Sequence, residues 1–150
     1  MIILENRKAR HNYEIIKKYT AGIKLLGEEV KALREGKGTF RGAYVKPIKG
    51  DIYLINFNLQ KYTKSSNPNY NPKRARKLLL KKKEIREITS ELNNKGRTAI
   101  PLKIFLKNNL FKLDLAIAKG LGKSQKKQKL KEKQIERDIQ RELKSIRNQF

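Results

Sequence analysis

The sequence predicts a mainly antiparallel β fold that closes into a small barrel and carries two or three flanking helices. Three observations predict this class. Apolar and polar residues alternate over residues 13–25 and 110–118, which is the period of a half-buried strand. Short segments containing Gly or Asn separate consecutive apolar runs, as hairpin turns do. Two further segments, 27–34 and 81–94, have helical character and end close to a glycine.

In the first half of the chain, the alternation over 13–25 predicts one long strand, interrupted only by Lys17. The next segment, 27–34, is predicted to be a short helix. Acidic residues occupy its first turn and Arg34 its last, as the helix dipole favours. Two strands should follow and pair across a turn that contains Gly and Asp: residues 40–48 and residues 52–59.

The second half begins with a loop, because residues 61–73 are rich in Asn, Ser and Pro. Residues 81–94 are expected to form a helix with one apolar face. A last hairpin should pair residues 98–106 with 110–118. Pro101 cannot donate a hydrogen bond to a neighbouring strand, so it should mark a sheet edge or a bulge.

Closing the sheet would bury one face of these five or six strands without leaving free edges. Among closed sheets, a barrel of the oligonucleotide-binding type is the first choice, and an open sheet covered by helices is the alternative. Residues 1–119 are assigned to this domain, and residues 120–150 to a tail.

The tail is basic: residues 119–150 contain 11 Lys and Arg against 4 Asp and Glu, with no aromatic residue before the last position. We expect it to be helical only when a polyanion or a partner surface receives it. The alternative is a helix that packs weakly on the barrel. Its helical pattern rests on five apolar residues: Ile135, Ile139, Leu143, Ile146 and Phe150.

Net charge points to the class of partner. The chain has 38 Lys and Arg against 14 Asp and Glu, a formal net charge of +24. Because such an excess weakens the compact state by self-repulsion, a polyanionic partner is expected, and nucleic acid fits best. No apolar anchor, signal peptide or cysteine is present in the sequence. We therefore expect a cytoplasmic protein with no membrane partner.

Catalysis is not expected. His11 is the single histidine and there is no cysteine, so neither a nucleophile–base set nor a zinc site can be assembled in the usual way. We expect no catalytic residue, no metal and no cofactor. The cations around His11 favour a phosphate or base contact for it, and a capping or packing role is the alternative.

Two basic runs adjoin predicted structured segments and are candidates for RNA binding. Arg7, Lys8 and Arg10 precede the first long strand, and Arg74, Arg76 and Lys77 precede three leucines. Arginine can grip phosphate in a bidentate manner or stack on bases. Aromatic side chains could add stacking surfaces, although those within strands, Tyr44 and Phe57, are more typical of a core, unlike the loop residues Tyr62 and Tyr70.

The order of these motifs resembles the SsrA-binding protein family. The runs that carry the resemblance cover nearly all of residues 3–120: NRKARHNY (6–13), AGI (21–23), GEEVKALREGK (27–37), YV (44–45), NFNL (56–59), NPKRARKLLL (71–80), KEI (83–85), PLK (101–103) and AIAKG (116–120). The resemblance implies an oligonucleotide-binding-type barrel that binds the tRNA-like domain of transfer-messenger RNA. It also implies delivery of that RNA to stalled ribosomes for trans-translation, with the tail forming a helix in the vacant messenger channel.

The partners implied by the resemblance are transfer-messenger RNA, ribosomal RNA of the decoding region and, through the RNA, elongation factor Tu and alanyl-tRNA synthetase. The RNA-facing residues it implies are Asn6, Arg7, Lys8, Arg10, His11, Lys31, Arg74, Arg76, Lys77 and Leu79. The ribosome-facing residues it implies in the tail are Gly120, Lys123, Lys126, Lys127 and Lys131.

The chain departs from the family pattern at several positions. In the tail, Leu121 and Gly122 replace two lysines, Ser124 replaces an aromatic residue or His, and Gln125 replaces an Asp. In the body, the departures are Thr20, where the family has an acidic residue, and Lys81, where it has His or Asn.

Two other functions fit the composition alone. A structural ribosomal protein or general RNA-binding module would have similar charge and a similar basic extension. An RNA-modifying enzyme would depend on His11.

Overall fold

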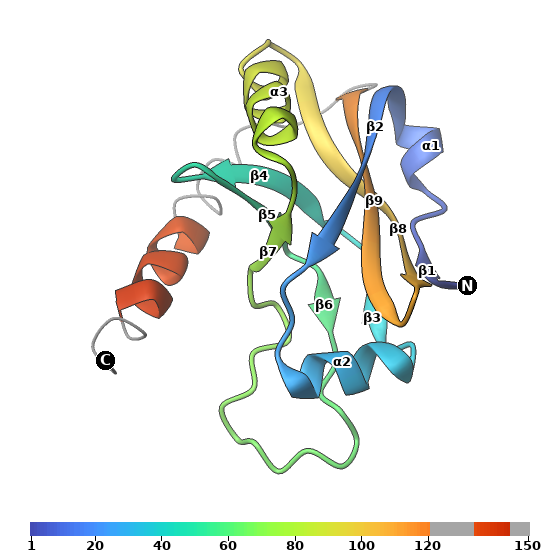
Figure 1. Ribbon diagram of the computed structural model, residues 1–150, viewed down its shortest axis with the longest axis vertical. Helices are drawn as coiled ribbons and strands as arrows, with labels where there is room; N and C mark the ends of the chain where they lie inside the picture. The colour runs from blue at the N-terminus through green and yellow to red at the C-terminus, as the bar shows by residue number, and fades with distance from the viewer. Residues whose placement is uncertain (121–133, 145–150) are drawn as a thin grey trace.

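The computed structural model describes residues 1–120 and 134–144, and the body is built around one antiparallel sheet (Figure 1). Within the described residues the sheet has seven strands in the order β1-β8-β4-β5-β7-β2-β9, and β9 also pairs with β8. Six strands therefore form a closed ring, with β1 added outside β8. The seven strands are β1 (Ile2–Glu5), β2 (Tyr13–Ile23), β4 (Tyr44–Ile48), β5 (Asp51–Ile55), β7 (Arg76–Leu79), β8 (Arg97–Lys107) and β9 (Leu110–Gly120).

A second, two-stranded sheet pairs β3 (Gly38–Thr39) with β6 (Asn58–Leu59). Three helices lie within residues 1–120: α1 (Ala9–Asn12), α2 (Gly27–Arg34) and α3 (Lys82–Leu92). Figure 1 shows α3 and α2 at opposite ends of the sheet. Residues 134–144 form a further helix beside β4 and β5. No helix in the described part of the chain is long and apolar enough to cross a membrane.

The predicted strands at the two ends of the body are confirmed. β2 pairs with β9 from Tyr13 opposite Gly120 to Gly22 opposite Lys112, and β9 pairs with β8 along its whole length. Leu113, Leu115 and Ile117 are all fully buried, as the alternation predicted. A register shift in the β8–β9 pairing between Pro101 and Lys103 confirms the bulge expected at the proline.

Both predicted hairpin turns use residues with positive φ. In the β4–β5 turn, Lys49 has φ 50° and Gly50 has φ 84°. In the β8–β9 turn, Asn108 has φ 53° and Asn109 has φ 64°. Two consecutive left-handed residues give the twist that matches antiparallel strands, and Gly and Asn adopt this conformation most readily.

The middle of the chain differs from the prediction. The strand expected over 40–48 begins only at Tyr44, and the strand expected over 52–59 is divided into β5 and β6. The division falls at Asn56, whose φ is 62° and whose side-chain amide donates to the carbonyl of Gly42 at 3.1 Å. A left-handed residue cannot continue a strand, so the chain turns there. β1, α1, β3 and β7 were not predicted.

Both helices predicted for the body are confirmed. In α2, Ala32 and Leu33 are fully buried, and Gly36 follows with φ 70°. In α3, the carboxylate of Glu84 accepts the backbone N–H of Lys81 at 3.1 Å, which satisfies one of the free amides at the helix start. Glu87 of α3 accepts hydrogen bonds from Lys17 and Tyr19 of β2, and so fixes the helix on the sheet.

The main core lies between the strands of the ring and the faces of α2 and α3. It combines Leu54, Phe57, Leu113 and Leu115, all at most 1% exposed, with Ile88 of α3. A smaller cluster sits elsewhere on the sheet, where Ile139 of the helix 134–144 packs against Ile48, Tyr53 and Ile55. The body therefore has its own core, and the helix 134–144 is attached through a separate contact.

Candidate nucleic-acid interface

The structure divides the predicted RNA-facing residues into two main groups on different sides of the ring. The first group, Asn6 to His11, lies in the turn after β1 and on α1, beside β8. The second group, Arg74 to Leu79, lies on and just before β7. β4 and β5 separate β8 from β7 in one direction, and β9 and β2 separate them in the other. Lys31 stands apart from both groups, on α2.

The first group holds exposed cations on a fixed backbone. Ala9 is 3% exposed and packs against Ile100 and Ala118. Asn6 is tied to β8 by its backbone N–H, which donates to the carbonyl of Leu102 at 2.7 Å. Its side-chain amide donates to the carbonyl of Pro101 at 2.8 Å. Asn6 therefore has a structural role in this segment.

Between and beside these anchors, Arg7, Lys8 and His11 are exposed. Arg10 and His11 lie in α1, and Arg7 and Lys8 lie in the turn that precedes it. Because Asn6 and Ala9 fix the backbone of this turn and helix, the exposed side chains of Arg7, Lys8 and His11 are presented without the ordering cost that a free tail would bear on binding.

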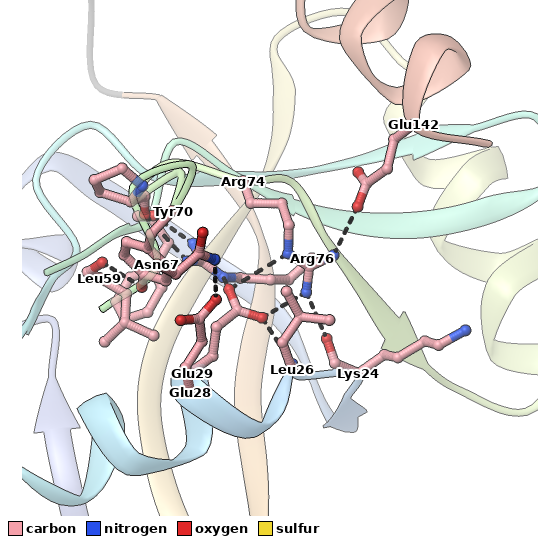
Figure 2. Close-up of polar contacts among 12 residues, drawn as sticks. Lys24, Leu26, Glu28, Glu29, Leu59, Asn67, Tyr70, Arg74, Arg76 and Glu142 are labelled. Carbon is pink, nitrogen blue, oxygen red and sulfur yellow. Dashed lines mark hydrogen bonds and ion pairs between the residues drawn. The ribbon is translucent and has the colours of Figure 1, made fainter. Parts of the chain in front are cut away.

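The second group is organised around one buried carboxylate, that of Glu29 (Figure 2). One carboxylate oxygen accepts from Nη2 of Arg74 at 2.6 Å and from the N–H of Leu26 at 2.8 Å. The other accepts from Nε of Arg76 at 2.7 Å. Two guanidinium groups and a backbone amide thus satisfy a charge that would otherwise be costly to bury.

Burial alone would raise the pKa of Glu29, because it disfavours the charged form. The hydrogen bond from Arg74 and the positive charge of Arg76 outweigh burial, so the pKa of Glu29 lies below its ordinary value of 4.5. Burial acts against the charge of Arg74 as well, but Glu29 raises the pKa of Arg74 above its ordinary value. Both groups are charged at neutral pH, and α2 is joined to the start of β7 by ion pairs.

Arg76 is fully buried, and its remaining donors also point to protein acceptors. Nη1 donates to the carbonyl of Phe57 at 2.7 Å and Nη2 to that of Pro72 at 3.1 Å, while the guanidinium lies 5.5 Å from the Phe57 ring centre. A side chain with 0% exposure offers no surface to a nucleic acid. In this structure Arg76 is a structural residue that fixes the loop before β7.

The other predicted residues near β7 and α2 reach the surface. Lys77 lies 3.4 Å from Asp51 and is partly exposed. Leu79 is 53% exposed and lies opposite Gly22 of β2. The two strands approach closely here: a Cβ atom added to Gly22 would lie 3.3 Å from the Cβ of Leu79. Lys31 is exposed and stands over the ring of Tyr62 at 5.6 Å.

The predicted loop 61–73 is held against α2 by side-chain hydrogen bonds. Glu28 accepts from Ser65 at 3.0 Å and from Asn67 at 2.9 Å, and Thr63 donates to Glu35 at 2.8 Å. The hydroxyl of Tyr70 donates to the carbonyl of Leu59 at 2.7 Å (Figure 2). This hydrogen bond anchors Tyr70 within the loop.

Phe57 is buried in the core, as its position in a predicted strand indicated, and Tyr44 packs beside the cluster around Ile139. The structural roles of Glu28 and Glu29 were not predicted from the sequence, where both count only as favourable charges at a helix start. The sequence signal for these roles was the pair of adjacent acids, Glu28 and Glu29, in a chain whose basic run at residues 73–77 needs anionic partners.

The helix 134–144 reaches the second group. Glu142 accepts from Nη1 of Arg74 at 3.3 Å (Figure 2). A cavity of about 330 Å³ lies between this helix, the start of α2 and the loop before β7. Ile135, Asp138, Ile139 and Glu142 line it from the helix side.

Of the tail residues predicted to face the ribosome, Gly120 lies at the end of β9. Lys123, Lys126, Lys127 and Lys131 lie outside the described residues, as do the departures at Leu121, Gly122, Ser124 and Gln125. In the body, Thr20 donates to Asp114 at 2.7 Å, and Lys81 precedes α3 with an exposed side chain.

Comparison with known proteins identifies the family. A profile of the SmpB protein family matches residues 3–145. The chain is 48% identical over 120 residues to an SsrA-binding protein of Rhizobium johnstonii, a match that covers 79% of this chain and 80% of the relative. It is 42% identical over 120 residues to an SsrA-binding protein of Christiangramia forsetii, covering 79% and 76% of the two chains.

Among solved structures, one described as "tmRNA-SmpB: a journey to the center of the bacterial ribosome" matches with a TM-score of 0.68 and 43% identity, covering 84% of this chain and 89% of the other. The sequence profile, the relatives and the shared fold all agree. The chain belongs to the SmpB protein family, the family of SsrA-binding proteins.

Proposed function

We propose that this protein binds transfer-messenger RNA through its tRNA-like domain and brings it to stalled ribosomes for trans-translation, without catalysing a reaction. The observation that carries this proposal is the family match over residues 3–145, together with the fold shared with a solved structure named for tmRNA and SmpB. The net charge of +24 is consistent with a polyanionic partner.

We propose that the ring of strands is a barrel of the oligonucleotide-binding type, with residues 1–119 as the RNA-binding domain and residues 120–150 as a tail that enters the messenger channel. Closure of the ring by the β8–β9 pairing supports the barrel. The tail residues Gly120, Lys123, Lys126, Lys127 and Lys131 are proposed to face ribosomal RNA.

The exposed cations Arg7 and Lys8, with Arg10 and His11 beside them, are proposed as one contact surface for the RNA. Leu79, Lys77 and Lys31 are proposed as further contacts, because their side chains reach the surface. Asn6 and Arg76 contribute by fixing the backbone that carries these contacts. Arg74 is bound to Glu29 on its inner side and reaches the surface on its outer side.

The proposed setting is the cytoplasm, where translation takes place. Elongation factor Tu and alanyl-tRNA synthetase are proposed as indirect partners that meet the protein through the bound RNA. Neither requires a contact surface on this chain.

A binding titration tests the function. Purified protein is titrated against transfer-messenger RNA at several salt concentrations, with excess ordinary tRNA as competitor. We expect retention of transfer-messenger RNA and a salt slope of roughly −0.7 to −0.9 per phosphate contact. Equal competition by tRNA would mean that binding is unspecific electrostatic attraction, and would contradict the proposal.

A further inference from the structure

The charges on the helix 134–144 are sorted by face. The helix contains three basic and three acidic residues, so it is neutral within a chain of net charge +24. Asp138 and Glu142 line the cavity on the side of the body. Arg137, Arg141 and Lys144 line a different hollow, next to Lys49. The helix therefore turns an acidic and apolar face towards the body.

The surface that receives this face carries charged residues at one edge and apolar residues at the other. Lys73 and Arg74 line the cavity together with Glu28 and Glu29. Arg74 and Arg76 neutralise Glu29, and Glu28 accepts hydrogen bonds from Ser65 and Asn67, so Lys73 and the outward edge of Arg74 are the cations that meet the two acids of the helix. Ile48, Tyr53 and Ile55 receive Ile139, which is 3% exposed. Charge complementarity and apolar burial together hold the helix on the outer side of β4 and β5.

The guanidinium of Arg74 has an inward and an outward edge, and each binds a different part of the protein. Its Nε and Nη2 atoms face inward, towards Glu29 and the carbonyl of Lys24. Its Nη1 faces the helix and donates to Glu142 at 3.3 Å (Figure 2). A carboxylate oxygen thus binds the outward edge of a guanidinium, which is where a phosphate oxygen would bind.

We propose that Lys73, Arg74 and the adjoining cavity form a contact surface for the phosphate backbone of RNA, and that the helix 134–144 occupies this surface in the free protein in place of the RNA. The inference rests on the proposed function, since it takes transfer-messenger RNA as the ligand. The helix and the RNA exclude one another, so each weakens the binding of the other by the same factor.

Point substitutions on the helix provide the first test. Ile139→Ser removes the buried apolar contact without changing charge, and Leu143→Ser is its matched control because Leu143 is 43% exposed. Glu142→Gln removes the carboxylate from Arg74, and Glu136→Gln is its control, with the same change of charge on the same helix. Ile139 belongs to a cluster separate from the main core, so the body should stay folded.

We expect Ile139→Ser to tighten binding of transfer-messenger RNA by about threefold to tenfold. The docked helix lowers the fraction of protein molecules whose RNA surface is free, and a helix of 11 residues is only marginally stable without its apolar contact. Glu142→Gln should tighten binding by a smaller factor, and neither control should differ from the wild type. Unchanged or weaker binding by Ile139→Ser and Glu142→Gln overturns the inference. Failure of every variant to prefer transfer-messenger RNA over tRNA refutes the proposed function instead.

Thiol labelling tests the reciprocal effect, because the chain contains no cysteine. Ile139→Cys should react slowly with a maleimide in the free protein and several-fold faster when transfer-messenger RNA is bound. Leu143→Cys, on the exposed side, reports the reactivity of the undocked environment and should react fast in both states. Slow labelling of Ile139→Cys that RNA leaves unchanged overturns the inference.

Discussion

The N-terminal segment around α1 and the cluster around Glu29 are both rich in cations, yet the structure uses those cations in opposite ways. In the first, Arg7 and Lys8 are exposed on a backbone pinned by Asn6 and Ala9. In the second, Arg76 is fully buried and Arg74 is largely covered, both bound to one carboxylate. A basic run beside a strand can therefore form a binding surface or an internal support, and acids placed elsewhere in the chain decide which.

The largest expected difference between the two regions is in stability. Glu29→Ala would leave two guanidinium groups facing a buried cavity without their anion, and should lower the free energy of unfolding by about 3–5 kcal/mol. Arg7→Ala changes an exposed side chain and should stay within about 0.5 kcal/mol of the wild type. Urea unfolding of the two variants measures both values. A small effect of Glu29→Ala would mean that the cluster is not a support.

The same carboxylate makes the stability contributed by the Glu29 cluster depend on pH. Folding depresses the pKa of Glu29, so its stabilising contribution is complete above its ordinary value of 4.5 and is lost as the pH falls from there through the lower pKa of the folded state. We expect stability to fall with acidification below pH 4.5, and Glu29→Gln to flatten that part of the curve. Thermal unfolding measured at a series of pH values compares the two proteins.

For RNA binding we expect the larger effect in the N-terminal segment, the region whose substitution should hardly change stability. The double variant Arg7→Ala, Lys8→Ala should leave stability unchanged and weaken binding of transfer-messenger RNA. Losing two phosphate contacts should also lower the salt slope by about 1.4 to 1.8. Lys107→Ala with Lys49→Ala is a control of equal charge, at the end of β8 and in the β4–β5 turn. If the control weakens binding as much, the N-terminal cations act only through net charge.

Within the N-terminal segment, Asn6 stabilises the backbone, whereas the neighbouring cations are proposed to contact RNA. Asn6→Ala removes the hydrogen bond to the carbonyl of Pro101 and should cost about 0.5–1.5 kcal/mol of stability. Asn12→Ala, at an exposed position at the end of α1, should cost less. Chemical denaturation gives both values. Equal stability of the two variants would show that the hydrogen bond is not needed to hold this segment.

Alternation of apolar residues was enough to predict β2 and β9, and β8 was predicted as the partner of β9 across the Asn-containing turn. The Asn and Gly turns were predictable for a local reason, since few residues adopt positive φ. β1 and α1 were missed because four residues are too short for a period to emerge. β7 was missed because two of its four residues are Arg76 and Lys77, and charged residues predict surface loops better than strands.

Burial of Arg76 and the role of Glu29 could not be predicted from local pattern. Charged residues are seldom fully buried unless paired, and the two members of this pair, Glu29 and Arg76, are 47 positions apart in the sequence. Only the tertiary arrangement brings them together. The tail was predicted to become helical only on a polyanion or a partner surface, with a helix packed weakly on the barrel as the alternative. In the structure the helix 134–144 packs on β4 and β5, and this surface, far away in the chain, was not predicted from the sequence.

Ring closure has a consequence for the time course of folding. Tyr13 at the start of β2 pairs with Gly120 at the end of β9, so the ring cannot close until β9 has been synthesised. Contacts between residues so distant in sequence form slowly, since a long loop must be ordered before they form. During synthesis the apolar face of β2 therefore stays exposed until β9, its last neighbour, has been made. A nascent chain cut short before β9 should be recognised as unfolded by chaperones and proteases.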